Sequence, residues 1–257
     1  RSSDLGKGVE VVLVRDLDMG SHNITLSTSF ESISNCTFNG NNHTIANYTL
    51  SNKQYAGLLP NAIRVTVKNL TLKNANITAV NDGSNNAYAG GFIGRAYGTN
   101  VVENCTLENS IVQGINKVGG IAGFQAENGI SIRKCTVKGS TIKVDTENQE
   151  YGQCGGILGY IGSVAAANEV SGNFIINTKV EAPANTNIGE EHRKSSICVG
   201  TLQGVKGQSL VIDMPFSYIQ SSTFNGKAID KTEYMGLLGG IRYEETQPSL
   251  TINGTRF

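Results

Sequence analysis

Tryptophan is absent from the 257 residues, and proline and histidine are rare, with four and three copies. Charged residues make up only 16 %, and 21 basic side chains balance 21 acidic ones. Without an excess of positive charge, nothing draws the chain to nucleic acid or to anionic lipid. The longest weakly polar stretch, residues 155–167, is too short and too rich in glycine to cross a bilayer. We therefore expect no nucleic-acid partner and no membrane insertion by this chain.

Glycine, asparagine, threonine, serine, isoleucine and valine dominate what remains. This mixture is typical of many short strands joined by tight turns, and it argues against helices and against disorder. The chain begins at Arg1 rather than at methionine. We expect a processed or trimmed chain, whose export signal lay upstream.

Two short blocks recur in step along the chain, always in the same order. The Gly block follows the pattern Gly-Gly-aliphatic-aliphatic-Gly, and its copies lie at 56–59, 90–94, 119–123, 155–159, 199–202 and 235–239. The Asn block is exemplified by Asn69-Leu70-Thr71-Leu72, and its copies lie at 35–38, 47–50, 69–72, 104–107, 134–137, 173–176 and 221–224. Two blocks in step form a far stronger signal than either block alone.

Each block has the character of a strand. In Leu70-Thr71-Leu72 apolar residues alternate with a polar β-branched one, the pattern of a strand with one buried face. The paired glycines of the other block permit close backbone approach or unusual dihedral angles at a corner. A period of about 30 residues without helical periodicity predicts an all-β, single-stranded parallel β-helix, or β-solenoid, of about eight coils. We expect one domain over residues 1–257, with a cap and first coil at 1–30, repeats at 31–240 and a C-terminal cap at 241–257.

Insertions concentrate at one corner of the predicted coil. The step from a Gly block to the next Asn block is nearly constant in the middle of the chain, whereas the reverse step varies widely. We expect the loops at residues 79–89, 144–153 and 181–197 to lie side by side and to bind a partner if the chain has one. The alternative is that they are solvated bulges that protect a sheet edge. The candidate ligand-binding residues in these loops are Asp82, Tyr88, Asp145, Glu147, Tyr151, Glu190, His192 and Arg193.

The five cysteines occupy repeat positions where other copies carry a bulky apolar residue. Cys36, Cys105 and Cys135 take the second place of the Asn block, as do Tyr48, Leu70 and Phe174, while Cys154 and Cys198 precede a Gly block. Stacked neighbours about 4.8 Å apart are too distant for the Cβ separation of a disulfide, so we expect buried free thiols. No cysteine–histidine grouping suggests zinc, and we expect no metal and no cofactor.

Eight Asn-x-Ser/Thr triplets would be glycosylation acceptors in a eukaryotic ectodomain. They begin at Asn23, Asn35, Asn42, Asn47, Asn69, Asn76, Asn104 and Asn253. Four of them are the Asn block itself, in which we expect the asparagine to turn a corner and the threonine to face solvent. The structural interpretation is therefore favoured.

Catalysis is the alternative function, since β-helices also carry enzymes that cleave acidic polysaccharides. Such chemistry needs carboxylates at a matched separation, or carboxylates around calcium with an arginine or lysine base. Candidates are Asp16 with Asp18, the acidic residues of 145–150, and the segment 190–193. None recurs in register with a carboxylate of a neighbouring coil, and the three histidines are scattered. We expect no catalytic residues.

The copies at 90–94, 119–123 and 155–159 resemble the repeats of the GLUG-motif family, found in bacterial surface adhesins and beside the catalytic part of some secreted proteases. Residues 38–45 and 15–19 resemble the elements that introduce such arrays, and the resemblance covers about residues 10–240. It implies a right-handed β-helix in a cell-adhesion protein of the Bacteroidetes type. The sequence departs from the pattern at 199–204 and at Pro60, where a closing glycine is usual. The family offers no agreed catalytic residues to carry over.

Together these observations predict a non-catalytic, adhesin-like module that presents stacked loops to a glycan or to a host or matrix protein. We expect it outside the cell, at the bacterial surface, either anchored in the outer membrane or secreted. The alternative is a β-helical carbohydrate-active enzyme of the polysaccharide lyase or hydrolase type. Carboxylates from three consecutive coils around calcium would favour the enzyme, and a face without such groups would favour the binding module.

Overall fold

The computed structural model describes residues 8–20, 23–26, 32–81, 83, 86–145, 152–162, 168–182, 198–203, 210–213, 218–220, 223–224, 238–242 and 250–253. Side chains are described for these residues up to 200, apart from 23–26. Strands, turns and bends make up these segments, and none of them contains a helix that could span a membrane.

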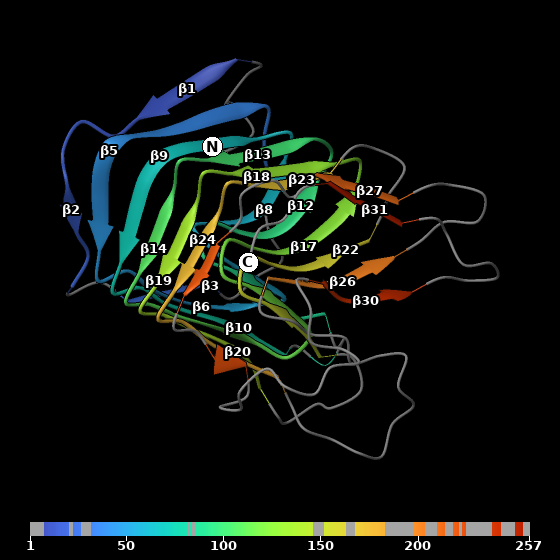
Figure 1. Cartoon of the computed structure of the whole chain (residues 1–257). Helices are drawn as coiled ribbons and strands as arrows, with labels where there is room; N and C mark the ends of the chain where they lie inside the picture. Colours follow the sequence, from blue (N-terminus) through green and yellow to red (C-terminus); the bar gives the residue numbers. More distant parts are fainter. Residues whose placement is uncertain are drawn as a thin grey trace.

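The strands form four sheets that run side by side along the molecule (Figure 1). Every hydrogen-bonded pair of neighbouring strands in the described segments is parallel. Stacked parallel strands without helical crossovers make the fold a β-solenoid, as the repeat predicts.

Sheet A has thirteen strands: β1 (Val9–Val12), β2 (Leu17–Asp18), β5 (Cys36–Ala46), β9 (Thr66–Lys73), β13 (Asn100–Glu103), β14 (Thr106–Glu108), β18 (Ile130–Arg133), β19 (Thr136–Lys138), β23 (Asn168–Ser171), β24 (Phe174–Ile176), β27 (Leu210–Asp213), β28 (Tyr218–Gln220) and β31 (Leu250–Asn253). Sheet B has seven: β3 (Asn23–Leu26), β6 (Thr49–Lys53), β10 (Asn76–Val80), β15 (Ile111–Gly114), β20 (Thr141–Val144), β25 (Lys179–Glu181) and β29 (Thr223–Phe224).

Sheet C also has seven strands: β4 (Ile33–Ser34), β8 (Leu59–Ile63), β12 (Ile93–Tyr97), β17 (Ala122–Glu127), β22 (Leu158–Ile161), β26 (Val199–Gln203) and β30 (Leu238–Arg242). Sheet D has four: β7 (Tyr55–Ala56), β11 (Tyr88–Gly90), β16 (Lys117–Gly119) and β21 (Gln153–Gly155). A coil passes from sheet A through B, D and C and returns to A. Thus β9, β10, β11 and β12 are followed by β13, which pairs with β9.

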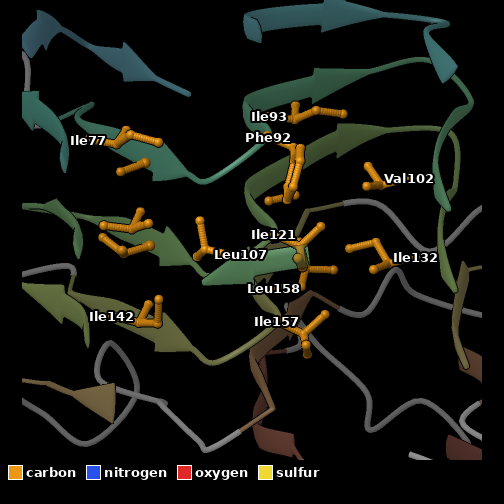
Figure 2. Packing of buried hydrophobic residues seen from close by; sticks show 14 of the residues in the cluster. Ile77, Phe92, Ile93, Val102, Leu107, Ile121, Ile132, Ile142, Ile157 and Leu158 are labelled. Carbon is orange, nitrogen blue, oxygen red and sulfur yellow. The ribbon is translucent and has the colours of Figure 1, made fainter. Parts of the chain in front are cut away.

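The interior is filled by columns of similar apolar residues from successive coils. Phe92, Ile121 and Ile157 lie one above another, as Figure 2 shows, and each is fully buried. Val102 and Ile132 form part of a second column, from sheet A. Fully burying one such side chain contributes about 1.5–3 kcal/mol. Since each coil adds a residue to every column, stability accumulates from contacts between neighbouring coils.

Residues with positive φ, a conformation that favours asparagine and glycine, recur at three bends of the described coils. At the bend from sheet C to sheet A these residues are Asn35, Arg64, Gly98 and Asn128. At the bend within sheet A they are Asn42, Asn69, Asn104, Lys134 and Gly172. At the bend from sheet A to sheet B they are Asn47, Asn74, Asn109, Gly139 and Asn177. The prediction that asparagine turns the corner is therefore confirmed. The assignment of all Asn blocks to one repeat position is wrong, because several bends need the same backbone conformation.

The register also corrects the placement of the cysteines. All five are free and buried, as predicted. Cys105 and Cys135 stack in one column. Cys36 belongs to another column, because Thr37 pairs with Thr66 and Cys36 is therefore level with Val65. Phe174, expected in the interior column, pairs with Thr136 and is 42 % exposed. A shift of one residue along a strand moves each side chain to the opposite face.

The Gly block serves close approach of two backbones rather than unusual dihedral angles. A Cβ added to Gly119 would lie 2.0 Å from the carbonyl oxygen of Ala122, and one added to Gly123 would lie 2.7 Å from the carbonyl oxygen of Ala89. Neither glycine has a positive φ. Sheets D and C thus meet where only glycine leaves room.

The irregular copies of the Gly block are also explained by register. Pro60 takes the place of the closing glycine, opposite Gly94, as expected. The copy at 199–202 is shifted relative to the prediction, because Val199 pairs with Leu158 and so brings Gly200 level with the closing Gly159. Cys198 consequently lies level with Ile157 rather than with Cys154.

Candidate functional site

The predicted loops leave the solenoid from sheet B. The first two join β10 to β11 and β20 to β21, and the third runs from β25 to β26 in sheet C. Since β10, β20 and β25 belong to one sheet, the prediction that insertions share a corner is confirmed. Of the candidate binding residues, the structure describes two, Tyr88 and Asp145. The others, Asp82, Glu147, Tyr151, Glu190, His192 and Arg193, lie outside the described residues.

The two described candidates lie in different surroundings. Asp145 follows β20, and its backbone N–H donates to the carbonyl oxygen of Gly114 at 2.6 Å. Tyr88 begins β11, and its hydroxyl donates to Asn86 Oδ1 at 2.7 Å. Burial raises the pKa of Tyr88 to about 12, so the phenol stays protonated at neutral pH. Tyr88, unlike Asp145, belongs to a larger cluster.

That cluster is a line of four rings across successive coils, here called the aromatic row: Tyr55, Tyr88, Phe124 and Tyr160. The rings of Tyr55 and Tyr88 are stacked, with centroids 5.3 Å apart. Tyr88 meets Phe124 edge to face at 4.9 Å, and Phe124 meets Tyr160 in the same way at 5.5 Å. Pairs of this kind contribute about 0.5–1.5 kcal/mol beyond the area they bury.

Two cations lie against the row. The Lys117 ammonium is 4.6 Å from the ring centroid of Tyr88, 4.9 Å from that of Phe124 and 5.0 Å from that of Tyr160. It also donates to Asn116 Oδ1 at 3.2 Å. The Arg95 guanidinium lies 5.5 Å from the centroid of Tyr55 and 5.7 Å from that of Tyr97. These distances fall within the range of cation–π attraction.

The Gly block explains why these side chains meet. In sheet D, Tyr55, Tyr88 and Lys117 are in register, each two residues before a glycine. In sheet C, Arg95, Phe124 and Tyr160 are in register, each directly after a closing glycine. Because the glycines let the two sheets approach closely, side chains at these offsets meet across the corner.

Sequence reasoning found only Tyr88 among the row and its cations. It missed Tyr55, Phe124, Tyr160, Arg95 and Lys117. The sequence signal for these residues is their fixed distance along the chain from the glycines of the Gly block. This distance becomes visible when the copies are aligned by their glycines. Neither paired carboxylates nor loop position, the two criteria used above, selects residues at this distance.

On sheet A two carboxylates lie on either side of an arginine from the coil between them. Arg133 lies 3.0 Å from Glu103 Oε2 and 3.6 Å from Glu169 Oε2, and Glu169 also accepts from Ser131 and Ser171. Although burial opposes it, these hydrogen bonds and the nearby Arg133 hold the pKa of Glu169 below its ordinary value. A general acid needs a raised pKa, so Glu169 is ill suited to that role. No group of three or more potential metal-binding side chains occurs among the described residues.

Residues 85–112 match the GLUG motif. This stretch contains Tyr88, the Gly block at 90–94 and Arg95. No curated protein matches this chain. A solved structure from Bacteroides ovatus, named "putative immunoglobulin A1 protease", is similar over 97 % of this chain and 78 % of that one, with a TM-score of 0.56 and 17 % sequence identity. At this identity the likeness concerns the fold, and it supports the solenoid.

Asp16 and Asp18, considered above as catalytic candidates, attach the N-terminal segment to β5. Asp16 Oδ1 accepts from the N–H of Thr44 at 2.8 Å and lies 3.1 Å from His43 Nδ1. Asp18 Oδ1 accepts from Asn47 Nδ2 at 2.8 Å. These bonds, the one from Thr44 above all, lower the pKa of Asp16, and the one from Asn47 lowers that of Asp18. Both carboxylates are thus engaged in structural contacts.

Acid is therefore expected to loosen residues 8–20 before the central coils. A carboxylate whose pKa is lowered by folding stabilises the fold above its unfolded pKa of about 4, and this contribution is lost as the pH falls through the folded value. Hydrogen exchange should show falling protection of β1 and β2 between about pH 5 and 2.5, with β10 and β15, which carry no carboxylate, unchanged. In the variant Asp16→Asn with Asp18→Asn the segment should be less protected at pH 7, and its protection should change less with pH. Equal protection of wild type and variant at all pH values would contradict the assignment.

Proposed function

We propose that this chain is a non-catalytic, adhesin-like binding module that acts outside the cell, displayed on a bacterial surface or secreted. Right-handed winding in about eight coils belongs to the same proposal, on the resemblance to GLUG-motif repeats. The observation that carries the proposal is the aromatic row with its two cations, which lies beside the corner where the variable loops leave the solenoid.

Two of the variable loops lead directly into the strands of sheet D that lie at the aromatic row. Tyr88 directly follows the loop after β10, and Gln153, in register with Lys117, ends the loop after β20. A rigid solenoid that holds rings and cations beside loops of variable length is suited to recognition, because side chains that the scaffold already positions lose less conformational entropy at binding.

The enzyme alternative finds less support in the described residues. Its best candidate is the Glu103–Arg133–Glu169 cluster, in which a shared guanidinium compensates both carboxylates. Carboxylates that share one guanidinium in this way are typical of structural ion pairs. The neighbouring solved structure is named as a protease, and that name concerns its own chain.

The proposal predicts that the chain binds partners on an array of glycans and of host and matrix proteins. Replacement of residues 183–197 with a short Gly/Ser linker should lower binding of at least one partner by about tenfold, since one such contact region is worth on the order of 1.4 kcal/mol. The matched control replaces residues 163–167, between β22 and β23 at a different corner. Circular dichroism and thermal unfolding verify that both variants fold.

Binding of no partner by the wild type would contradict the proposal. So would cleavage of an array polysaccharide or protein with turnover, which would identify an enzyme. Equal binding by both loop variants and the wild type would refute the role of the loop corner.

A further inference from the structure

The outer side chains of sheet A compensate one another's charge. Lys68 pairs with Glu10 at 3.1 Å, Lys138 pairs with Glu108 at 3.2 Å, and Arg133 pairs with Glu103 at 3.0 Å. Lys73 and Lys134 also lie within 4 Å of a carboxylate, at 3.8 and 3.9 Å. Each of these cations on sheet A therefore has an anionic partner within the protein.

Arg95, on sheet C, has a different environment. Its guanidinium is half-buried between the rings of Tyr55 and Tyr97, and no carboxylate of the described residues lies within ion-pair distance of it. Glu127, which is level with Tyr97 in the neighbouring strand, instead accepts a hydrogen bond from the Tyr97 hydroxyl, which raises the pKa of Tyr97. The rings hold the guanidinium in place, so little rotamer entropy remains to be lost on binding an anion.

The groups around Arg95 are flat and only partly covered. Tyr55, Tyr97 and Phe124 are half-buried, whereas Tyr88 and Tyr160 are 6 % and 3 % exposed. The two buried rings thus support the row, and the exposed surface consists of three rings with Arg95 and Lys117. Ring faces of tyrosine and phenylalanine pack against apolar surfaces such as the C–H face of a pyranose. A guanidinium binds a carboxylate through two parallel hydrogen bonds.

We propose that Tyr55, Arg95, Tyr97 and Phe124 form a binding subsite for a carboxylate-bearing sugar, with Arg95 pairing with the carboxylate. The inference rests on the proposed binding function and names its ligand class and residues. The rings contact the pyranose face, and Lys117 adds positive charge beside Phe124. The source of the acidic sugar is either a uronic-acid polymer or a sialic-acid-terminated glycan, which share this chemistry.

An acidic peptide fits this surface less well. Extended peptides add to a sheet through unpaired backbone groups at its edge. Here the strands that carry Arg95, Tyr97 and Phe124 are paired on both sides, β12 with β8 and β17, and β17 with β12 and β22. Of the strands that carry the subsite, only β7, with Tyr55, ends its sheet in the described residues. Around Arg95 side chains alone are therefore available for recognition, which suits a ring-shaped ligand more than a peptide backbone.

The test is isothermal titration calorimetry of the full chain with a galacturonic acid tetrasaccharide and with sialyllactose. Their neutral counterparts, a galactose tetrasaccharide and lactose, serve as ligand controls. At least one acidic sugar should bind at least about tenfold more tightly than its neutral counterpart, and Arg95→Gln should abolish this preference. Tyr55→Leu should weaken the acidic and the neutral sugar alike. Arg133→Gln, which removes a cation of sheet A, should leave both affinities unchanged.

The outcomes separate this inference from the broader proposal. Equal affinity for acidic and neutral sugars, or an unchanged preference in Arg95→Gln, overturns the subsite. A poly-glutamate peptide that binds as tightly as the acidic sugar, and that loses affinity in Arg95→Gln, overturns the ligand class. If the arrays find a partner that depends on residues 183–197 but not on Arg95 or Tyr55, the subsite is refuted while the binding function stands. Absence of binding in both experiments refutes both.

Discussion

Gly119→Ala is expected to destabilise the solenoid by at least about 3 kcal/mol, the upper range for overpacking of a filled interior. The new methyl group would lie 2.0 Å from the carbonyl oxygen of Ala122 and close to the N–H of Gly159, at 2.7 Å. Both are backbone atoms of stacked strands, so neither can move without breaking interstrand hydrogen bonds. Denaturant unfolding with hydrogen exchange measures the loss, which should centre on β16, β17 and β22.

A matched substitution separates the clash from a general intolerance of alanine. Gly83→Ala lies in the loop after β10, where an added Cβ meets nothing within 4 Å. Its φ of +93° adds strain, so a cost of about 1 kcal/mol is expected. If Gly119→Ala costs no more than Gly83→Ala, close approach of sheets D and C is not the reason for the Gly block.

Asn100→Leu is expected to cost about 3 kcal/mol, although the two side chains are similar in size. Asn100 is fully buried. Its Oδ1 accepts from the N–H of Val65 at 2.9 Å, and its Nδ2 donates to the carbonyl oxygens of Gly98 at 2.8 Å and Tyr97 at 3.1 Å. Leucine would leave these backbone groups buried without partners, each at a cost of about 1–3 kcal/mol.

The free energy of unfolding of Asn104→Gly is the control for that of Asn100→Leu. Asn104 is exposed, and its Nδ2 donates only to Asn69 Oδ1, at 2.8 Å. Glycine also accepts its positive φ without strain. The expected loss is below about 1 kcal/mol. A free energy of unfolding that falls equally in both variants would show that the buried amide of Asn100 has no special role.

The solenoid could be predicted because its two blocks repeat with the period of a strand and the spacing of a coil. The register could not, because Asn35, Asn47 and Asn69 satisfy the same backbone need at three different bends. A tetrapeptide that recurs at several bends gives no information about which bend it occupies. Phe174 shows the consequence, since a shift of one residue places it on the outer face instead of the interior.

The candidate site was harder to predict than the fold for a related reason. Tyr88 was selected as the end of a loop, yet its partners Phe124 and Tyr160 come from other coils and from a different sheet. They meet only because the glycines bring sheets D and C together. Nothing local to Phe124 distinguishes it from any outward-facing residue of a strand until the copies are aligned by their closing glycine.

The parallel stacking of sheets D and C has a further consequence for how such a surface can evolve. Each coil contributes one position from β7, β11, β16 or β21 of sheet D, and one from the strand of sheet C that follows it in the chain. Duplication of a whole coil would preserve its contacts with the coil before it and the coil after it, and would lengthen the aromatic row by one step of about 4.8 Å. The number of coils would then set how many units of a polymer the aromatic row can contact, independently of the affinity of each unit.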